Sequence, residues 1–125
     1  MSDIALQTEI IMGILSGNYT KTIMELNLKG IGNDDIKQIF RIDIFRRRII
    51  EYILEFSFIK DYNLQILLDK RSYNRIIENL EGFFKNDYIT EKDYRWIIDE
   101  IECRMNKIES KQNKMSQLFR HILCK

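Results

Sequence analysis

The sequence predicts an all-α fold, with five to seven helices packed as one irregular bundle and a long helical region at the C-terminal end. Three observations support this. Apolar residues recur at helical spacing along most of the 125 residues, proline is absent, and the chain is 45% hydrophobic and 31% charged. Apolar residues at intervals of three and four line one face of a helix, and a chain without proline lacks the commonest helix breaker. A chain of this length can form one domain with its own core, so we expect a single helical domain over residues 1–125.

Two short helices are expected at the N-terminal end. The first runs from Asp3, whose side chain is a suitable N-cap, to Leu15, and it ends near a glycine. The second spans residues 20–28 and ends at residues 29–32. Two glycines there predict a turn rather than a phosphate-binding loop, because no strand and no Gly-Lys-Ser/Thr motif accompany them. The apolar face of the first helix consists of Ile4, Ile11, Ile14 and Leu15.

A third helix is expected to begin at Asn33, with Ile36, Ile39 and Phe40 on its apolar face. The apolar phase then shifts near residues 41–43. This shift predicts a break, followed by a fourth helix over residues 44–60 that Asp43 caps. The inward positions of that helix are Ile42, Phe45, Ile49, Ile53, Phe56 and Ile59.

Residues 64–68 form a short apolar run that fits a helix or a strand, and the helical neighbours favour a helix. Ser72 is then expected to cap a helix that reaches Lys85, with Gly82 weakening it from inside. The inward positions of this helix are Tyr73, Ile76, Ile77, Leu80, Phe83 and Phe84.

The last helical region is expected to start at Thr90, because Thr90 and Asp93 have the spacing of a capping box. A heptad-like stripe follows, with steps of four and three residues. An unbroken helix over residues 91–124 would be about 50 Å long. Either the polar residues 109–114 break it and residues 109–125 form a separate amphipathic tail helix, or the helix protrudes and pairs with a second copy through the stripe; the break is favoured. The stripe comprises Tyr94, Ile98, Ile101, Met105, Ile108, Gln112, Met115, Phe119 and Ile122.

No residue pattern points to catalysis, to a metal ion or to a cofactor. His121 is the only histidine, and no partner for general-base catalysis can be assigned to it. Cys103 and Cys124 lack the spacing of a zinc site. On an unbroken helix they would lie about 31 Å apart, too far for a disulfide, so we expect free thiols in a reducing compartment. The first residues are acidic where a signal peptide is basic, and no apolar run approaches about 18 residues. We therefore expect a cytoplasmic protein without membrane contact.

The predicted helices and turn of residues 33–50 follow one another in the same order as those of a DNA-binding segment. Glycines and small polar residues precede a helix that contains Ile36, a tight turn follows, and the next helix opens with Arg46, Arg47 and Arg48. This order resembles the helix-turn-helix of LuxR-type regulators and sigma factors, which implies that the arginines contact phosphates and guanines. The alternative is a solvated helix face on which Arg47 pairs with Glu51. A net charge of +1 does not favour strong binding to nucleic acid.

Three aromatic residues are expected to contact a partner. Trp96 lies off the heptad stripe on a polar face, where a tryptophan is a suitable interface residue. Tyr62 and Tyr88 fall in turns between helices. Each of the three also fits ordinary packing against a neighbouring helix, and for Trp96 such packing is slightly favoured.

The size, helical character and lack of a catalytic pattern resemble those of the all-helical immunity proteins of bacterial contact-dependent inhibition and colicin systems. The isoleucine, asparagine and lysine bias is typical of AT-rich bacterial or phage genes. The resemblance implies a protein that neutralises a toxin or a defence enzyme by binding and occluding it. We therefore expect a non-catalytic protein-binding module. The alternative is a helix-turn-helix regulator, dimeric through the stripe from Tyr94 to Ile122.

Overall fold

A computed structural model describes the backbone of residues 2–60, 62–63 and 65–123, and the side chains of those residues as far as residue 109. Over this part of the chain it contains six helices and one two-stranded sheet, which confirms the mostly helical fold. No helix in the described part is long and apolar enough to cross a membrane. The elements, in chain order, are α1 (Asp3–Ser16), α2 (Tyr19–Leu28), α3 (Asn33–Phe40), α4 (Asp43–Ser57), β1 (Phe58–Lys60), β2 (Ile66–Leu68), α5 (Lys70–Lys85) and α6 (Glu91–Leu123).

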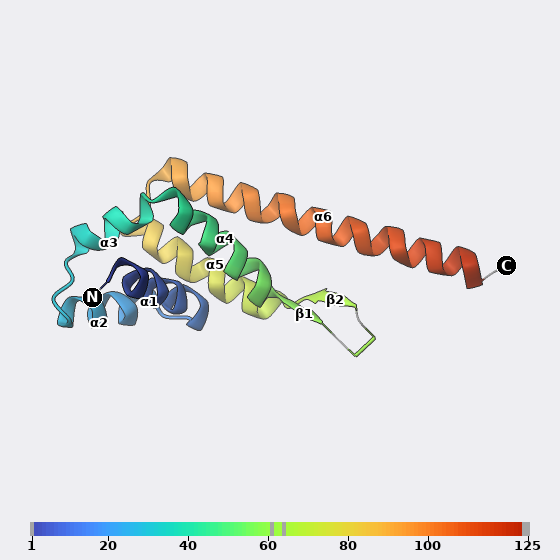
Figure 1. Cartoon of the computed structure of the whole chain (residues 1–125), viewed down its shortest axis with the longest axis horizontal. Helices are drawn as coiled ribbons and strands as arrows, with labels where there is room; N and C mark the ends of the chain where they lie inside the picture. The colour runs from blue at the N-terminus through green and yellow to red at the C-terminus, as the bar shows by residue number, and fades with distance from the viewer. Residues whose placement is uncertain (1, 61, 64, 124–125) are drawn as a thin grey trace.

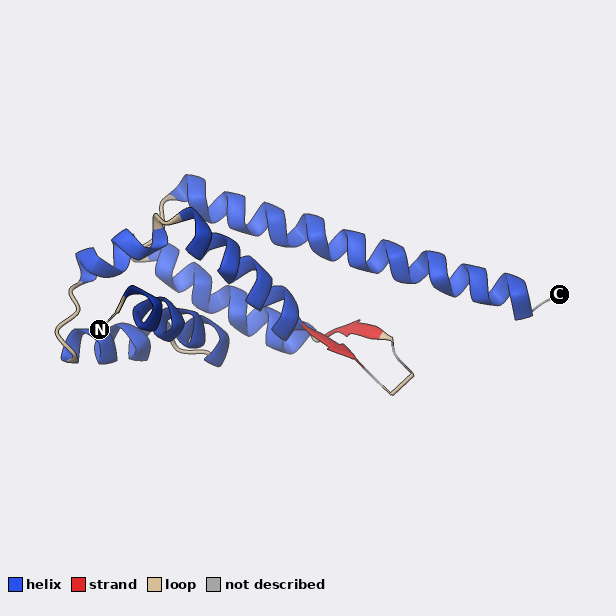
Figure 2. Ribbon diagram, in the orientation of Figure 1, coloured by secondary structure: helices blue, strands red, loops and turns tan. Residues whose placement is uncertain are grey.

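Helix α4 is the central element of the bundle. It contacts α1, α3, α5, α6 and β1. Figure 1 shows α6 crossing one side of the bundle and continuing well past it, while the β1–β2 hairpin extends from the same end of the bundle. The hairpin and the free end of α6 are the two parts that project from the body of the bundle (Figure 2).

The core is built from the helix faces that the sequence predicts for α3 and α5. Ile36, Ile39 and Phe40 are buried, as are Ile76, Leu80 and Phe83 on α5. The Phe40 ring lies between two others, with centroid distances of 5.4 Å to Phe45 and 5.2 Å to Phe83. Edge-to-face and tilted ring pairs at these distances add to the stabilisation from burial alone.

Two helix contacts depend on glycine. A Cβ atom on Gly13 would overlap the side chain of Thr22, and one on Gly82 would overlap the ring of Tyr19. The prediction that Gly82 weakens its helix is therefore incomplete. Glycine lowers the intrinsic propensity of α5, but here it also lets α2 approach α5 closely enough for the Tyr19 ring to lie against the Phe83 ring.

Three predicted helix starts are wrong by one to three residues. Ser2 rather than Asp3 caps α1, through a hydrogen bond from the Ala5 N–H to Ser2 Oγ. Asp69 rather than Ser72 caps α5, and Asp43 is the first residue of α4 instead of its cap. Several polar residues lie near the start of each of these helices. The residue that becomes the N-cap depends on where the preceding segment enters the helix.

Part of the predicted inward faces is exposed. Ile4 on α1 is 69% exposed, while Leu6 and Ile10 on the same helix are buried. On α4 the predicted face holds for Phe45, Ile49 and Ile53, but it fails at its two ends. The residues at those ends, all exposed, are Ile42, Phe56 and Ile59.

The helix favoured for residues 64–68 is wrong, and so is the end of the fourth helix. Helix α4 ends at Ser57, and the chain then forms a hairpin in which Phe58 pairs with Leu68, Ile59 with Leu67 and Lys60 with Ile66. Each strand has only three residues, a length at which periodicity cannot separate helix from strand. The pairing of Phe58–Lys60 with Ile66–Leu68 across the turn is what makes these segments strands. The periodicity of one short segment does not reveal its pairing with another.

The break favoured near residues 109–114 is also wrong. Helix α6 runs without interruption from Glu91 to Leu123, and its 33 residues correspond to about 50 Å. Residues 91–123 contain no glycine or proline, and the polar stretch consists largely of residues that favour helix. The described part of the predicted tail helix is thus the continuation of α6, and residues 124–125 lie outside the described chain. The start at Thr90 is confirmed, because Thr90 Oγ1 accepts a hydrogen bond from the Asp93 N–H.

Candidate protein-binding surface

The arginines proposed for DNA binding are engaged within the chain. Arg46 is 14% exposed; it donates a hydrogen bond to the Phe40 carbonyl at 3.0 Å and lies 3.6 Å from the Asp93 carboxylate. Arg46 therefore ties the end of α3 to α4 and α6. Arg48 donates to Gln7 Oε1 on α1 at 3.1 Å.

Arg47 has a different partner from the one expected. Its Nε lies 2.8 Å from Asp43 Oδ2, one turn back along α4, so the expected pairing with Glu51 is wrong. This hydrogen bond raises the pKa of the Arg47 guanidinium. The same guanidinium lies 5.4 Å from the centre of the Trp96 ring on α6. The three arginines thus all have partners within the chain, Arg46 in a largely buried position and Arg47 and Arg48 at the surface.

Two of the three aromatic residues proposed as partner contacts pack inside the molecule. Trp96 is half-buried against the core, as the packing alternative expects. Tyr88 is 8% exposed, and its ring lies edge-on to Phe83 at 5.9 Å. Burial also raises the pKa of the Tyr88 hydroxyl. Neither ring offers a partner an exposed face comparable with that of Tyr62, which is 94% exposed in the hairpin turn.

Tyr62 belongs to a larger group of exposed apolar side chains, which we call the hairpin surface. Twelve large hydrophobic residues are exposed in the described part of the chain, and half of them fall between residues 52 and 67. Tyr52 and Phe56 are in ring contact at 6.5 Å on the last turns of α4. Cross-strand partners point to the same face of a sheet, so Ile59 and Leu67 lie together on one side of the hairpin. The hairpin surface comprises Tyr52, Phe56, Ile59, Tyr62 and Leu67, whereas Ile66, which pairs with Lys60, is exposed on the other face of the hairpin.

The base of the hairpin is held firmly at its junction with α4 and α5. The Asp69 N–H donates a hydrogen bond of 2.7 Å to the Ser57 carbonyl, which closes the two strands. The Asp69 carboxylate accepts from the Ser72 hydroxyl at 2.6 Å and from the Ser72 N–H at 3.2 Å. These bonds lower the pKa of Asp69, with the hydroxyl contributing most. One residue thus caps α5 and anchors the end of β2.

A groove extends the hairpin surface toward α1. It has a volume of about 410 Å³ and lies between α1 and α4, beside Tyr52. Its walls include the exposed side chains of Ile4 and Met12, with Arg48 and Glu51 as polar residues. An apolar surface edged by a few charged groups is the usual anatomy of a protein–protein interface.

Sequence periodicity missed most of this surface because it placed Phe56 and Ile59 inside. The available signal was the pair of apolar runs at residues 58–59 and 66–68, separated by a segment in which Lys60, Asp61, Asn63 and Gln65 are polar. Two such runs around a polar turn are typical of a hairpin. A hairpin turns alternate residues away from the bundle, which leaves apolar side chains exposed on its outer side.

The described residues include no group of three histidine, cysteine or acidic side chains placed to hold a metal ion. Cys103 is an exposed free thiol, while the side chains of His121 and Cys124 lie outside the described part. Comparisons with protein-family models, with curated proteins and with solved structures find no match to this chain.

Proposed function

We propose that this chain is a non-catalytic inhibitor that binds a cognate toxin or defence enzyme through the hairpin surface and occludes its active site. The observation that carries the proposal is the exposed apolar hairpin with Tyr62 at its turn. Large aromatic residues on a projecting element are suited to fill a cleft in another protein, since they contribute much contact area for little loss of side-chain freedom.

The rigidity of the hairpin base supports this proposal. Binding costs less when the contacting residues are already held in place. The Ser57–Asp69 hydrogen bond and the Asp69 cap hold the ends of the two strands to α4 and α5, so the base of the hairpin is already in place before binding. An immunity protein of a bacterial toxin system fits this description. Its complex with the toxin would contain one copy of this chain for each active site of the toxin.

The test is co-expression with the product of the neighbouring gene. The expected result is that the neighbouring product arrests growth alone, and that this chain restores growth and co-purifies with it in a stoichiometric complex. Tyr62→Asp and Phe56→Asp should each weaken the complex at least about 30-fold, because truncating a central interface residue costs 2 kcal/mol or more.

Leu28→Asp is the matched control. Leu28 is 81% exposed on α2, at the opposite end of the bundle from the hairpin (Figure 1), so the same charge is introduced away from the hairpin surface. Protection that survives both hairpin substitutions would overturn the assignment of the surface. A neighbouring product that is neither toxic nor bound would overturn the inhibitor function itself.

The regulator alternative has one favourable observation, the short connection between α3 and α4. Against it, Arg46 and Arg48 are bonded to other elements, and α4 is surrounded by α1, α3, α5 and α6. A recognition helix has to enter the major groove with its side chains free. Sequence-specific DNA binding that weakens steeply with salt and is lost in Arg47→Ala would favour this alternative.

A further inference from the structure

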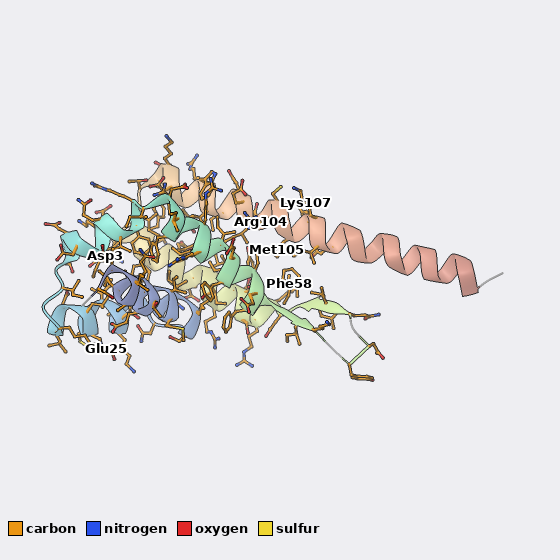
Figure 3. All side chains as sticks on the ribbon, in the orientation of Figure 1. Asp3, Glu25, Phe58, Arg104, Met105 and Lys107 are labelled. Carbon is orange, nitrogen blue, oxygen red and sulfur yellow. The ribbon has the colours of Figure 1, made fainter. Side chains whose placement is uncertain are left out.

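The side of α4 that lies beside α1 carries apolar side chains that no element of the described chain covers. Elsewhere α4 is covered by α6, on which Ile101 is fully buried and the Tyr94 ring stacks on Phe84 at 4.3 Å. The first half of the predicted α6 stripe is thus used within the bundle. In Figure 3, Asp3 at the start of α1 and Phe58 at the start of the hairpin lie toward opposite ends of the bundle, and the groove between α1 and α4 lies along this stretch.

The α1–α4 groove has a surface relief that another helix can fill. Along α1 its wall is the row Ile4, Thr8 and Met12, spaced four residues apart, in which a small residue lies between two large exposed ones. The Thr8 hydroxyl already has a partner, because it donates to the Ile4 carbonyl at 2.8 Å. The groove is apolar below this row, where Ile11 is almost fully buried. Helices pack by fitting such a row into the spaces between the side chains of another helix.

The charges beside the groove favour a basic occupant. Glu51 lines the groove, and Glu55 follows one turn later on the same face of α4. Neither carboxylate forms an ion pair with any residue that the structure describes. Two acidic residues four positions apart on a helix repel each other, and Glu55 lies in the last turn of α4, where the helix dipole disfavours a negative charge. Arg48 also lines the groove, but it donates to Gln7 on α1. A basic residue of a partner would relieve the repulsion between the two carboxylates.

We propose that an amphipathic, basic helix of the inhibited partner lies in the α1–α4 groove, with apolar residues against the α1 row and a lysine or arginine beside Glu51 and Glu55. This proposal rests on the inhibitor function, because the groove adjoins the hairpin surface at Tyr52 and one partner can contact both. A stable interface takes in about 20–30 residues a side. The hairpin surface alone provides fewer, so the contact has to extend beyond it.

The test measures the binding of the full chain to the neighbouring gene product. Glu51→Lys is expected to weaken the complex at least about 10-fold, because it sets like charges against each other, and the loss should shrink as the salt concentration rises. Met12→Ala removes an apolar contact and is also expected to weaken the complex at least about 10-fold.

Each substitution has a matched control. Glu78→Lys makes the same charge change on an exposed part of α5. Met24 is 56% exposed on α2, against 53% for Met12, so Met24→Ala removes an equally accessible side chain away from the groove. Both controls should leave the affinity within about twofold of the wild type, as for residues outside an interface.

The results distinguish failure of the groove from failure of the inhibitor function. If Tyr62→Asp and Phe56→Asp weaken the complex but Glu51→Lys and Met12→Ala do not, the groove is refuted and the inhibitor function stands. If the neighbouring product does not bind the wild-type chain, both proposals are refuted.

Photo-cross-linking in the same complex identifies the occupant. A p-benzoylphenylalanine introduced at Met12 is expected to capture a segment of the partner that has apolar residues at helical spacing and at least one lysine or arginine. The same probe at Met24 should capture nothing. Capture of an acidic segment at Met12, or of one without helical spacing, would overturn the assigned occupant.

Discussion

The guanidinium carbon of Arg47 lies 5.4 Å from the centre of the Trp96 ring, so that a charged residue of α4 covers the tryptophan of α6. Asp43 holds the guanidinium from the other side through a 2.8 Å hydrogen bond. A cation over an aromatic face is attracted by the ring, and the long side chain also shields the ring from water. This contact fastens the first half of α6 to the central helix.

Arg47→Ala is therefore expected to expose Trp96 and shift its fluorescence emission to longer wavelength. Trp96 is the only tryptophan in the chain, so the emission reports on the surroundings of this one ring. Arg95→Ala is the control, because Arg95 lies next to Trp96 in sequence but pairs with Glu91 at the surface. An unchanged spectrum in Arg47→Ala would show that the guanidinium does not cover the ring in solution.

Gly82→Ala is expected to lower the free energy of unfolding by about 1–3 kcal/mol, the usual cost of overpacking a close contact. The added methyl group would meet the Tyr19 ring, although alanine by itself favours helix. Chemical denaturation measures the loss, and Glu78→Ala, on an exposed part of α5, should change stability by less than about 0.5 kcal/mol. Combining Gly82→Ala with Tyr19→Ala should cost less than the sum of the two, since the clash is then gone.

Ser57→Ala is expected to leave stability unchanged or raise it by up to about 1 kcal/mol. The Ser57 side chain is fully buried, and its Oγ has no hydrogen-bond partner among the described residues. An unsatisfied buried hydroxyl is costly, so removing it relieves a penalty. Asn79→Ala should do the opposite, because the Asn79 side chain is buried and donates to the Arg75 carbonyl. A clear loss in Ser57→Ala would mean that the hydroxyl is bonded in solution.

Stability is expected to fall in alkaline solution. Burial raises the pKa of the Tyr73, Tyr88 and Tyr94 hydroxyls, so the folded chain holds these protons more tightly than the unfolded chain. Their contribution is complete below the unfolded tyrosine pKa of about 10, and it is lost as the pH rises through the folded values. Replacing the three residues by phenylalanine should flatten the dependence of unfolding free energy on pH above 10, whereas Tyr62→Phe serves as the exposed control. A dependence that survives the triple replacement would contradict this account.

The sequence was sufficient for the parts of the fold that follow helical periodicity. On α3 all three predicted inward residues are buried, and on α5 Ile76, Leu80 and Phe83 are buried while the other three predicted residues are half-buried, because apolar residues recur there at helical spacing. The hairpin could not be found this way, since its three-residue strands are specified by their pairing with each other. The course of α6 was missed for another reason. Periodicity predicts a break at the polar residues 109–114, whereas a helix that leaves the bundle needs no apolar residue on most of its surface.

Of the residues predicted as partner contacts, Tyr62 lies on the hairpin surface and Arg48 lines the adjoining groove. The sequence places aromatic residues in turns, but it does not tell which turns are covered by neighbouring helices. The turn between α5 and α6 is itself exposed at Asn86 and Asp87, but Tyr88 packs back onto Phe83 and is buried, whereas Tyr62 is exposed in a turn that projects. Arginine is likewise a residue type that is usually exposed. Only the tertiary arrangement brings Asp93 of α6 within 3.6 Å of Arg46.

The uninterrupted course of α6 makes it a stiff rod, and this stiffness determines the outline of the molecule. The helix is about 50 Å long, from the rise of 1.5 Å per residue, and it continues well past the bundle (Figure 1). The chain is therefore expected to sediment more slowly than a compact protein of the same mass.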